Sequence, residues 1–125
     1  MKTARLVTLI GSIALFITSC LHSMYYSSIL ERAQKEALHP ETAAILKTCW
    51  LTLSVTLLSL AVIAFLARSS PRGGAVVLIS GLAVAACGGL MLSFLGRFIG
   101  VYMLTLDAAL LVVGGGLQLK ASPAS

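Results

Sequence analysis

Residues 73–96 read GGAVVLISGLAVAACGGLMLSFLG and contain no Asp, Glu, Lys or Arg. A helix that crosses the hydrocarbon core of a bilayer needs about 20 predominantly apolar residues, so this stretch is long enough to span it. Three other stretches share the property: 6–30 and 48–67 carry no charge, and 98–119 is interrupted only by Asp107. The sequence therefore predicts an all-α membrane protein with four transmembrane helices.

The composition of the whole chain supports the same class. Of its 125 residues, 58% are hydrophobic and 10% are charged, whereas a soluble domain averages about a quarter charged residues. The apolar runs are continuous, which excludes a transmembrane β-barrel, because barrel strands alternate apolar and polar residues. We expect one integral membrane domain over residues 1–125, with the lipid bilayer as its first partner and no nucleic-acid partner.

The predicted architecture is an up-down four-helix bundle. Its spans lie at about 6–28, 46–67, 74–95 and 98–119, and an outer polar loop lies at about 29–45. Short connections make sequential helices antiparallel neighbours. The bundle therefore alternates direction along the chain.

The orientation follows from Lys and Arg, which are enriched on the cytoplasmic side of membrane proteins. With the N-terminus inside, the inner ends of the spans hold Lys2, Arg5, Arg68, Arg72 and Lys120. The outer ends then hold Arg32, Lys35, Lys47 and Arg97. The inner charges lie close to the span ends, so we predict that both termini are cytoplasmic. We expect the bacterial cytoplasmic (inner) membrane as the location.

The start of the chain leaves one alternative open. Residues 17–20, ITSC, resemble a bacterial lipobox, and a basic start followed by an apolar run is typical of signal peptides. The apolar run continues to Leu30, so we expect a retained helix, with lipidation of Cys20 as the alternative. The cysteines Cys20, Cys49 and Cys87 are scattered and form no C-x-x-C motif, so we expect no metal site and no cofactor.

Small and hydroxyl residues predict how the helices pack. Helices in lipid associate through close packing of small residues and through interhelical hydrogen bonds. Such faces comprise Thr8, Ser12, Leu15, Ser19, His22 and Tyr26 on the first span, Thr48, Thr52 and Ser59 on the second, Gly81, Ala85 and Gly89 on the third, and 114–116 on the fourth. We expect internal packing. The alternative is a seam on the Gly81 face, with a second copy or a membrane-protein partner.

Asp107 is the acidic residue inside a span, about 13 Å below the outer end at 1.5 Å per residue. A charge at that depth is costly, is usually turned inward and is a functional candidate by default. The same arithmetic places Thr18 about 12 Å, Ser54 about 10 Å and His22 about 6 Å deep. We predict an outer polar cluster of Asp107, His22, Thr18, Ser54, Lys47, Arg97 and Tyr102. For Asp107 itself we expect a structural role, with a hydrogen bond to a neighbouring hydroxyl, and a functional role is the alternative.

The sequence contains no G-x-S-x-G, H-E-x-x-H or phosphate-binding glycine loop, so we expect no enzyme. The aromatic residues Trp50, Tyr25, Tyr26 and Tyr102 fall near the outer boundary, where amphipathic rings are favoured. Our leading expectation is a non-enzymatic accessory or interaction subunit. The alternative is a small oligomeric transporter or channel in which Asp107 binds a proton or a cation.

Overall fold

The computed structural model describes residues 2–70 and 72–121, and the regular structure in these ranges is helical throughout. Its helices are α1 (Lys2–Met24), α2 (Tyr26–Lys35), α3 (Pro40–Ala67), α4 (Gly73–Leu95) and α5 (Ile99–Ala121). Four segments are long and apolar enough to cross a membrane: Lys2–Arg32, Pro40–Ala67, Gly73–Ser93 and Ile99–Ala121. The all-α class and the four apolar helices are confirmed. The side of the membrane on which the termini lie stays a prediction.

The polar connection after the first span is shorter than the predicted loop at 29–45. The helix is interrupted at Tyr25 but continues as α2 to Lys35. Pro40 then begins α3 in its first turn, where a missing backbone N–H leaves no helical hydrogen bond unmade. The connection is therefore a short turn, in which Ala37 has a positive φ of 47°.

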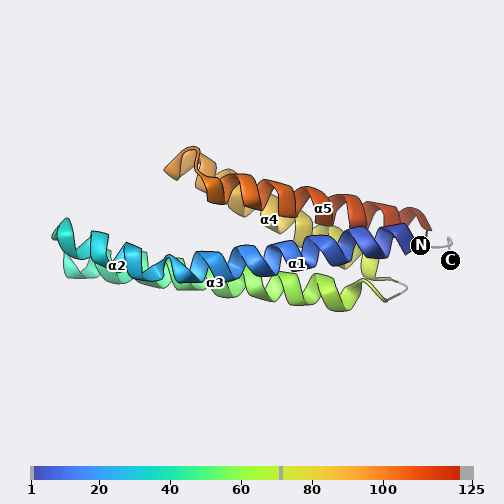
Figure 1. The fold of residues 1–125 in the computed structure, drawn as a ribbon, viewed down its shortest axis with the longest axis horizontal. Helices are drawn as coiled ribbons and strands as arrows, with labels where there is room; N and C mark the ends of the chain where they lie inside the picture. Colours follow the sequence, from blue (N-terminus) through green and yellow to red (C-terminus); the bar gives the residue numbers. More distant parts are fainter. Residues whose placement is uncertain (1, 71, 122–125) are drawn as a thin grey trace.

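The helices form two hairpins that pack side by side (Figure 1). One hairpin is α1–α2 with α3, and the other is α4 with α5. The start of α1 and the end of α5 lie at the same end of the bundle, which we call the inner end. At the opposite end, the outer end, α2 and the first half of α3 extend beyond the α4–α5 hairpin. Contacts are most extensive between α4 and α5, followed by α1 with α5 and α1 with α3.

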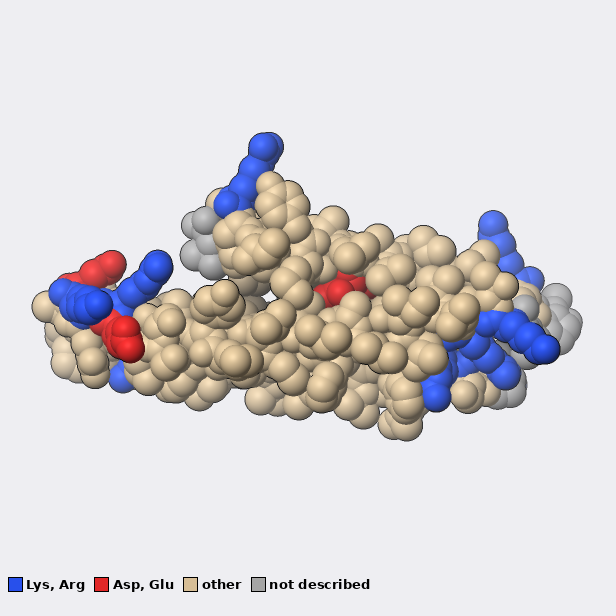
Figure 2. All heavy atoms as spheres, in the orientation of Figure 1, with Lys and Arg blue, Asp and Glu red and all other residues tan. Residues whose placement is uncertain are grey.

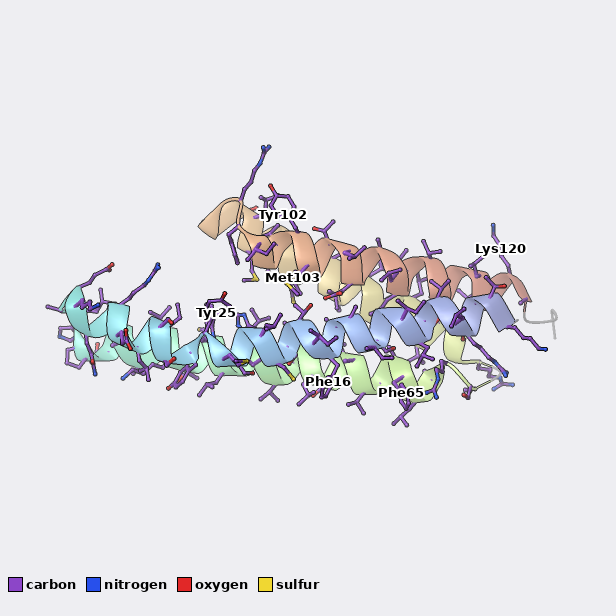
Figure 3. The ribbon with its side chains drawn as sticks, viewed as in Figure 1. Phe16, Tyr25, Phe65, Tyr102, Met103 and Lys120 are labelled. Carbon is purple, nitrogen blue, oxygen red and sulfur yellow. The ribbon has the colours of Figure 1, made fainter. Side chains whose placement is uncertain are left out.

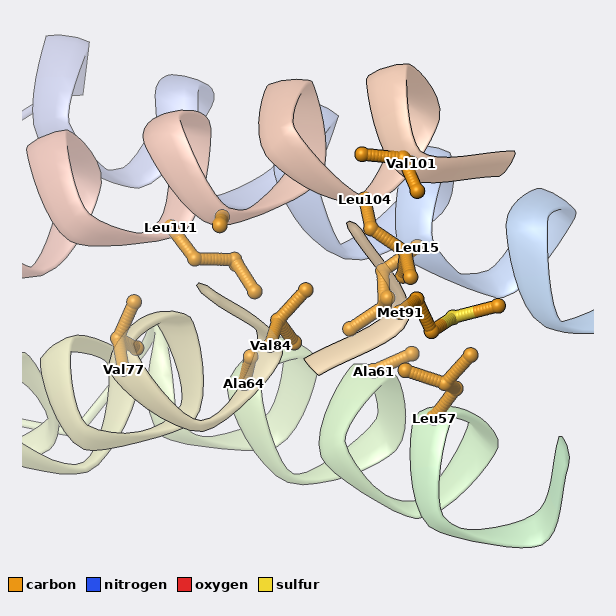
Figure 4. Packing of buried hydrophobic residues seen from close by; sticks show 11 residues of the cluster. Leu15, Leu57, Ala61, Ala64, Val77, Val84, Met91, Val101, Leu104 and Leu111 are labelled. Carbon is orange, nitrogen blue, oxygen red and sulfur yellow. The ribbon is translucent and has the colours of Figure 1, made fainter. Parts of the chain in front are cut away.

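Buried positions repeat with alternating steps of three and four residues. On α5 these positions include Val101, Leu104, Ala108 and Leu111. This seven-residue spacing is typical of helices that pack with a left-handed crossing, as most membrane bundles do. The buried apolar cluster draws on α1, α3, α4 and α5 (Figure 4). It comprises Leu15, Leu57, Ala61, Ala64, Val77, Val84, Met91, Val101, Leu104, Ala108 and Leu111.

Glycines allow the backbone of α5 to approach the two neighbouring helices, α1 and α4, closely. A Cβ atom added at Gly114 would lie 2.5 Å from Thr8 Oγ1 of α1, and one at Gly115 would lie 2.5 Å from the backbone N of Leu78 on α4. A Cβ at Gly11 would meet the Cβ of Leu110 at 3.0 Å. At Gly114 and Gly115 an added Cβ would require neighbouring atoms to move, and at Gly11 it would make a tight contact. These three glycines therefore fix α5 between α1 and α4.

The structure divides the predicted Gly81, Ala85 and Gly89 face. Gly81 is buried against α5, where an added Cβ would lie 2.8 Å from the backbone N of Val112. Ala85 and Gly89 are exposed, and an added Cβ at Gly89 meets nothing within 4 Å. The reason is the geometry of the α-helix. Residues eight positions apart point in directions that differ by roughly 80°, so a stripe of residues at four-residue steps gradually turns away from the interface. The buried seam of α4 instead continues to Gly88.

The prediction that the hydroxyl face of α3 packs inward is wrong. Thr48, Thr52 and Ser59 are exposed, whereas the buried residues of α3 are Ser54, Leu57, Ala61 and Ala64. The Ser59 hydroxyl donates to the backbone carbonyl of Val55 in its own helix at 2.8 Å. A hydroxyl satisfied in this way needs no partner on another helix, so it can face outward.

The exterior of the bundle is apolar between two charged ends. Large side chains such as Phe16 and Phe65 point outward and are 48% and 39% exposed (Figure 3). Lys and Arg gather at both ends of the molecule, and the belt between them shows no Lys or Arg and one small acidic patch (Figure 2). Soluble monomers rarely expose contiguous apolar surface on this scale. The four apolar helices and this belt are compatible with a small multi-pass integral membrane protein.

Candidate functional site

Asp107 makes a polar contact between the two hairpins. It lies on the buried face of α5 and is 2% exposed. Thr18, buried on α1, donates its hydroxyl hydrogen to Asp107 Oδ2 at 2.7 Å. The depth arithmetic places these residues at similar levels, and the structure brings them into contact. The carboxyl group thus gains one hydrogen bond that lipid could not supply.

A second set of polar contacts ties α1 to α3 near the same level. The Ser19 hydroxyl donates to the backbone carbonyl of Ser54 at 2.9 Å. One turn further out, Trp50 Nε1 donates to the backbone carbonyl of His22 at 2.8 Å. The His22 and Trp50 rings stack with centroids 4.0 Å apart and an interplanar angle of 13°. Trp50, predicted as a boundary residue, therefore also joins two helices.

His22 carries an unsatisfied polar atom. Its Nε2 is buried and has no hydrogen-bond partner in the described part of the chain. Buried polar groups are usually paired, and an exception needs a physical explanation. In this structure, the His22 side chain forms part of a cleft wall.

The cleft opens at the outer end, between α1–α2 and the tip of the α4–α5 hairpin, and has a volume of about 410 Å³. Figure 2 shows the opening as a notch in the molecular surface. Thr18, Leu57 and Leu104 line its deep part, and Arg32 of α2 lines its mouth. Met103 of α5 and Tyr25, at the break between α1 and α2, face each other across it (Figure 3). Asp107 lies behind Thr18 and does not line the cleft.

The structure brings together only part of the predicted outer cluster. Thr18 bonds Asp107, and His22 lines the cleft with Thr18, whereas the Ser54 carbonyl accepts from Ser19. Lys47, Arg97 and Tyr102 do not line the cleft. Tyr102 is 58% exposed and points away from it (Figure 3). Depth along a helix could not exclude these three residues, because the rotation of each helix decides which side chains face inward.

The sequence reasoning missed Gln118. It is buried on α5, and its Nε2 donates to Thr8 Oγ1 at 2.8 Å. The Thr8 hydroxyl in turn donates to the backbone carbonyl of Ala4 at 3.0 Å. The position of Gln118 in the sequence could have identified it. Gln118 is eleven residues after Asp107, and both lie on the buried face of α5.

The described ranges hold no group of three or more His, Cys, Asp or Glu that could bind a metal ion. Cys20 and Cys49 are exposed free thiols, and Cys87 is a half-buried one. The buried polar side chains of the described ranges carry hydroxyl, amide, imidazole and carboxyl groups. These groups hold helices together and can bind protons or polar ligands.

Comparison of the chain with models of known protein families, with curated proteins and with solved structures finds no match.

Proposed function

We propose that the protein is a non-enzymatic interaction subunit. It binds a transmembrane helix of another membrane protein along the lipid-facing side of α4 and α5. The observation that carries this proposal is a shallow groove of about 370 Å³ on that face. Small residues dominate the groove: Ala85, Gly88, Gly89, Ala108 and Ala109 line it. The groove is separate from the outer cleft and shares no lining residue with it.

The lipid environment makes such a groove significant. Lipid tails are as apolar as Leu, so helices associate where small residues allow their backbones to approach closely. Gly89 has open space where a side chain would be, and it does not pack against any helix of this chain. A partner helix could therefore approach the backbone here without displacing α5.

The experiment compares two glycines that have equally open surroundings. Gly89→Leu fills the groove, and Gly116→Leu adds the same side chain on α5, where an added Cβ also meets nothing within 4 Å. Native mass spectrometry of the full chain, tagged at its C-terminus and extracted in mild detergent, measures any bound protein. We expect a heteromeric complex of fixed stoichiometry that is reduced at least tenfold by Gly89→Leu and is retained by Gly116→Leu. A wild-type protein without a bound partner, or equal behaviour of both variants, would contradict the proposal. A homo-oligomer would assign the groove to a second copy.

A second candidate function rests on Asp107. The buried Asp107 is bonded to Thr18 at the floor of a cleft that opens outward, which supports proton or cation binding in a small oligomeric transporter. Asp107→Asn keeps an oxygen that can accept from Thr18, so we expect the folded amount to be unchanged. If the protein is a transporter, this variant abolishes ion or proton uptake by vesicles that contain the protein. Wild-type uptake in the Asn variant would rule out this mechanism.

The charge distribution supports the predicted orientation. Both termini would be cytoplasmic, because the inner end carries Lys2, Arg5 and Lys120 at the starts and ends of spans. In a bacterium, this arrangement fits the cytoplasmic membrane. Labelling of Cys49, an exposed thiol near the outer end, by a membrane-impermeant reagent added to intact cells tests it.

A further inference from the structure

We propose that the outer cleft is a binding site for an anionic phospholipid of the surrounding bilayer. One acyl chain fills the cleft, and the phosphate group pairs with Arg32 at its mouth. This inference does not depend on the proposed protein partner, because the cleft and the α4–α5 groove have no lining residue in common.

The length of the cleft matches one leaflet. Along α1 and α2, the rise from Thr18 at the floor to Arg32 at the mouth is roughly 21 Å at 1.5 Å per residue. Half of the hydrocarbon core is about 15 Å thick, and the headgroup region of one leaflet adds about 5–7 Å. An acyl chain beside Thr18 would therefore place its headgroup near the level of Arg32.

The width of the cleft favours a lipid chain over a protein helix. The cleft and its open mouth together enclose about 1140 Å³ of empty space. An α-helix with its side chains is about 10–12 Å in diameter, so roughly 21 Å of helix would occupy about 1,600 Å³ or more. A single extended hydrocarbon chain is the slimmer occupant, and it needs no hydrogen bonds from the walls.

The wall chemistry changes along the cleft in the direction that a lipid requires. The deep wall is largely apolar and includes Leu57, Met91 and Leu104. Tyr25 and Ser28 lie further out, and Arg32 lines the mouth. A guanidinium group can bind phosphate oxygens through two parallel hydrogen bonds. The cleft thus runs from apolar to cationic, as a phospholipid runs from its chain to its phosphate.

The positive charge at the mouth comes specifically from Arg32. Its helix α2 also carries Glu31 and Lys35, which do not line the cleft. The net charge of α2 is therefore small, although the group that faces the cleft is basic. A headgroup in the cleft therefore contacts Arg32 rather than Glu31 or Lys35.

The test uses the full-length protein in nanodiscs that contain equal amounts of phosphatidylglycerol and phosphatidylcholine with identical chains. Native mass spectrometry after release measures which lipid stays bound. We expect one retained lipid per wild-type chain, with phosphatidylglycerol favoured. Arg32→Gln should reduce that preference about fivefold, which is the contribution of one basic residue near a charged lipid surface. Arg97→Gln is the matched control, since it removes the same charge from an exposed residue of the outer end that does not line the cleft.

A second variant tests the chain-binding part of the site. Met103 projects into the cleft, so Met103→Trp should fill it and abolish retention of both lipids, whereas Met103→Leu should keep the wild-type pattern (Figure 3). Equal lipid preferences in Arg32→Gln and Arg97→Gln would overturn the proposal. So would full lipid retention in Met103→Trp, or a wild-type protein that leaves the nanodisc as a dimer without lipid.

Discussion

The interface between α1 and α5 is closely packed in its inner half and open in its outer half. In the inner half, Gly11 and Gly114 let the two backbones approach, and Gln118 bonds Thr8 across the interface. In the outer half, beyond the Thr18–Asp107 hydrogen bond, the helices border an open cleft. The comparison shows that apolar character alone does not bring two helices into close contact in lipid. Closure follows the small residues and the interhelical hydrogen bonds.

The side chains at the point of divergence agree with this explanation. Beyond Thr18, α1 presents Leu21 and His22 to the cleft, Tyr25 follows at the end of α1, and α5 presents Met103 and Leu104. These side chains are too large for backbone contact. Thr18 and Asp107 therefore mark the boundary between a closed seam and an open one.

The largest effect is expected when a small residue in the inner half is replaced by a large one. Gly114→Leu would drive a side chain into Thr8 and should destabilise the bundle by about 3 kcal/mol, at the upper end of typical overpacking costs. Gly116→Leu, on the same helix, has open space and should have little effect. Unfolding in mixed micelles with increasing SDS measures both. Equal stabilities would show that the inner seam yields easily to a large residue.

A truncation on each side of the boundary tests the same contrast. Leu111 is fully buried, so Leu111→Ala should cost about 2 kcal/mol through lost packing. Met103 already borders empty space, so Met103→Ala should change the free energy of unfolding by less than about 0.5 kcal/mol. The same SDS titration ranks them. A larger cost for Met103→Ala would mean that the outer cleft is closed in the membrane.

Among the changes that should destabilise the bundle, the smallest is expected at the boundary itself. Thr18→Val removes the hydrogen bond to Asp107 and should cost about 1 kcal/mol, within the range measured for interhelical hydrogen bonds in membranes. Thr56→Val is the matched control, because the exposed Thr56 hydroxyl bonds the carbonyl of Thr52 in its own helix. Identical stabilities of the two variants would mean that the Thr18–Asp107 bond does not hold the hairpins together.

The class of protein, the four apolar helices and the inward position of Asp107 can all be predicted from the order of the residues. These follow from one-dimensional properties: the length of uncharged stretches and the cost of placing a carboxyl group in hydrocarbon. The contact between Thr18 and Asp107 was also within reach, because depth along a helix follows from residue number.

Which polar residues share a site depends on how the helices pack in the folded protein. It turned Tyr102 outward and Met103 into the cleft, and it exposed Gly89 while burying Gly81. The physical reason is helix rotation. Each span is apolar nearly all round, so its hydrophobic pattern does not fix the inward face, and close contacts such as that between Gly114 and Thr8 fix it instead.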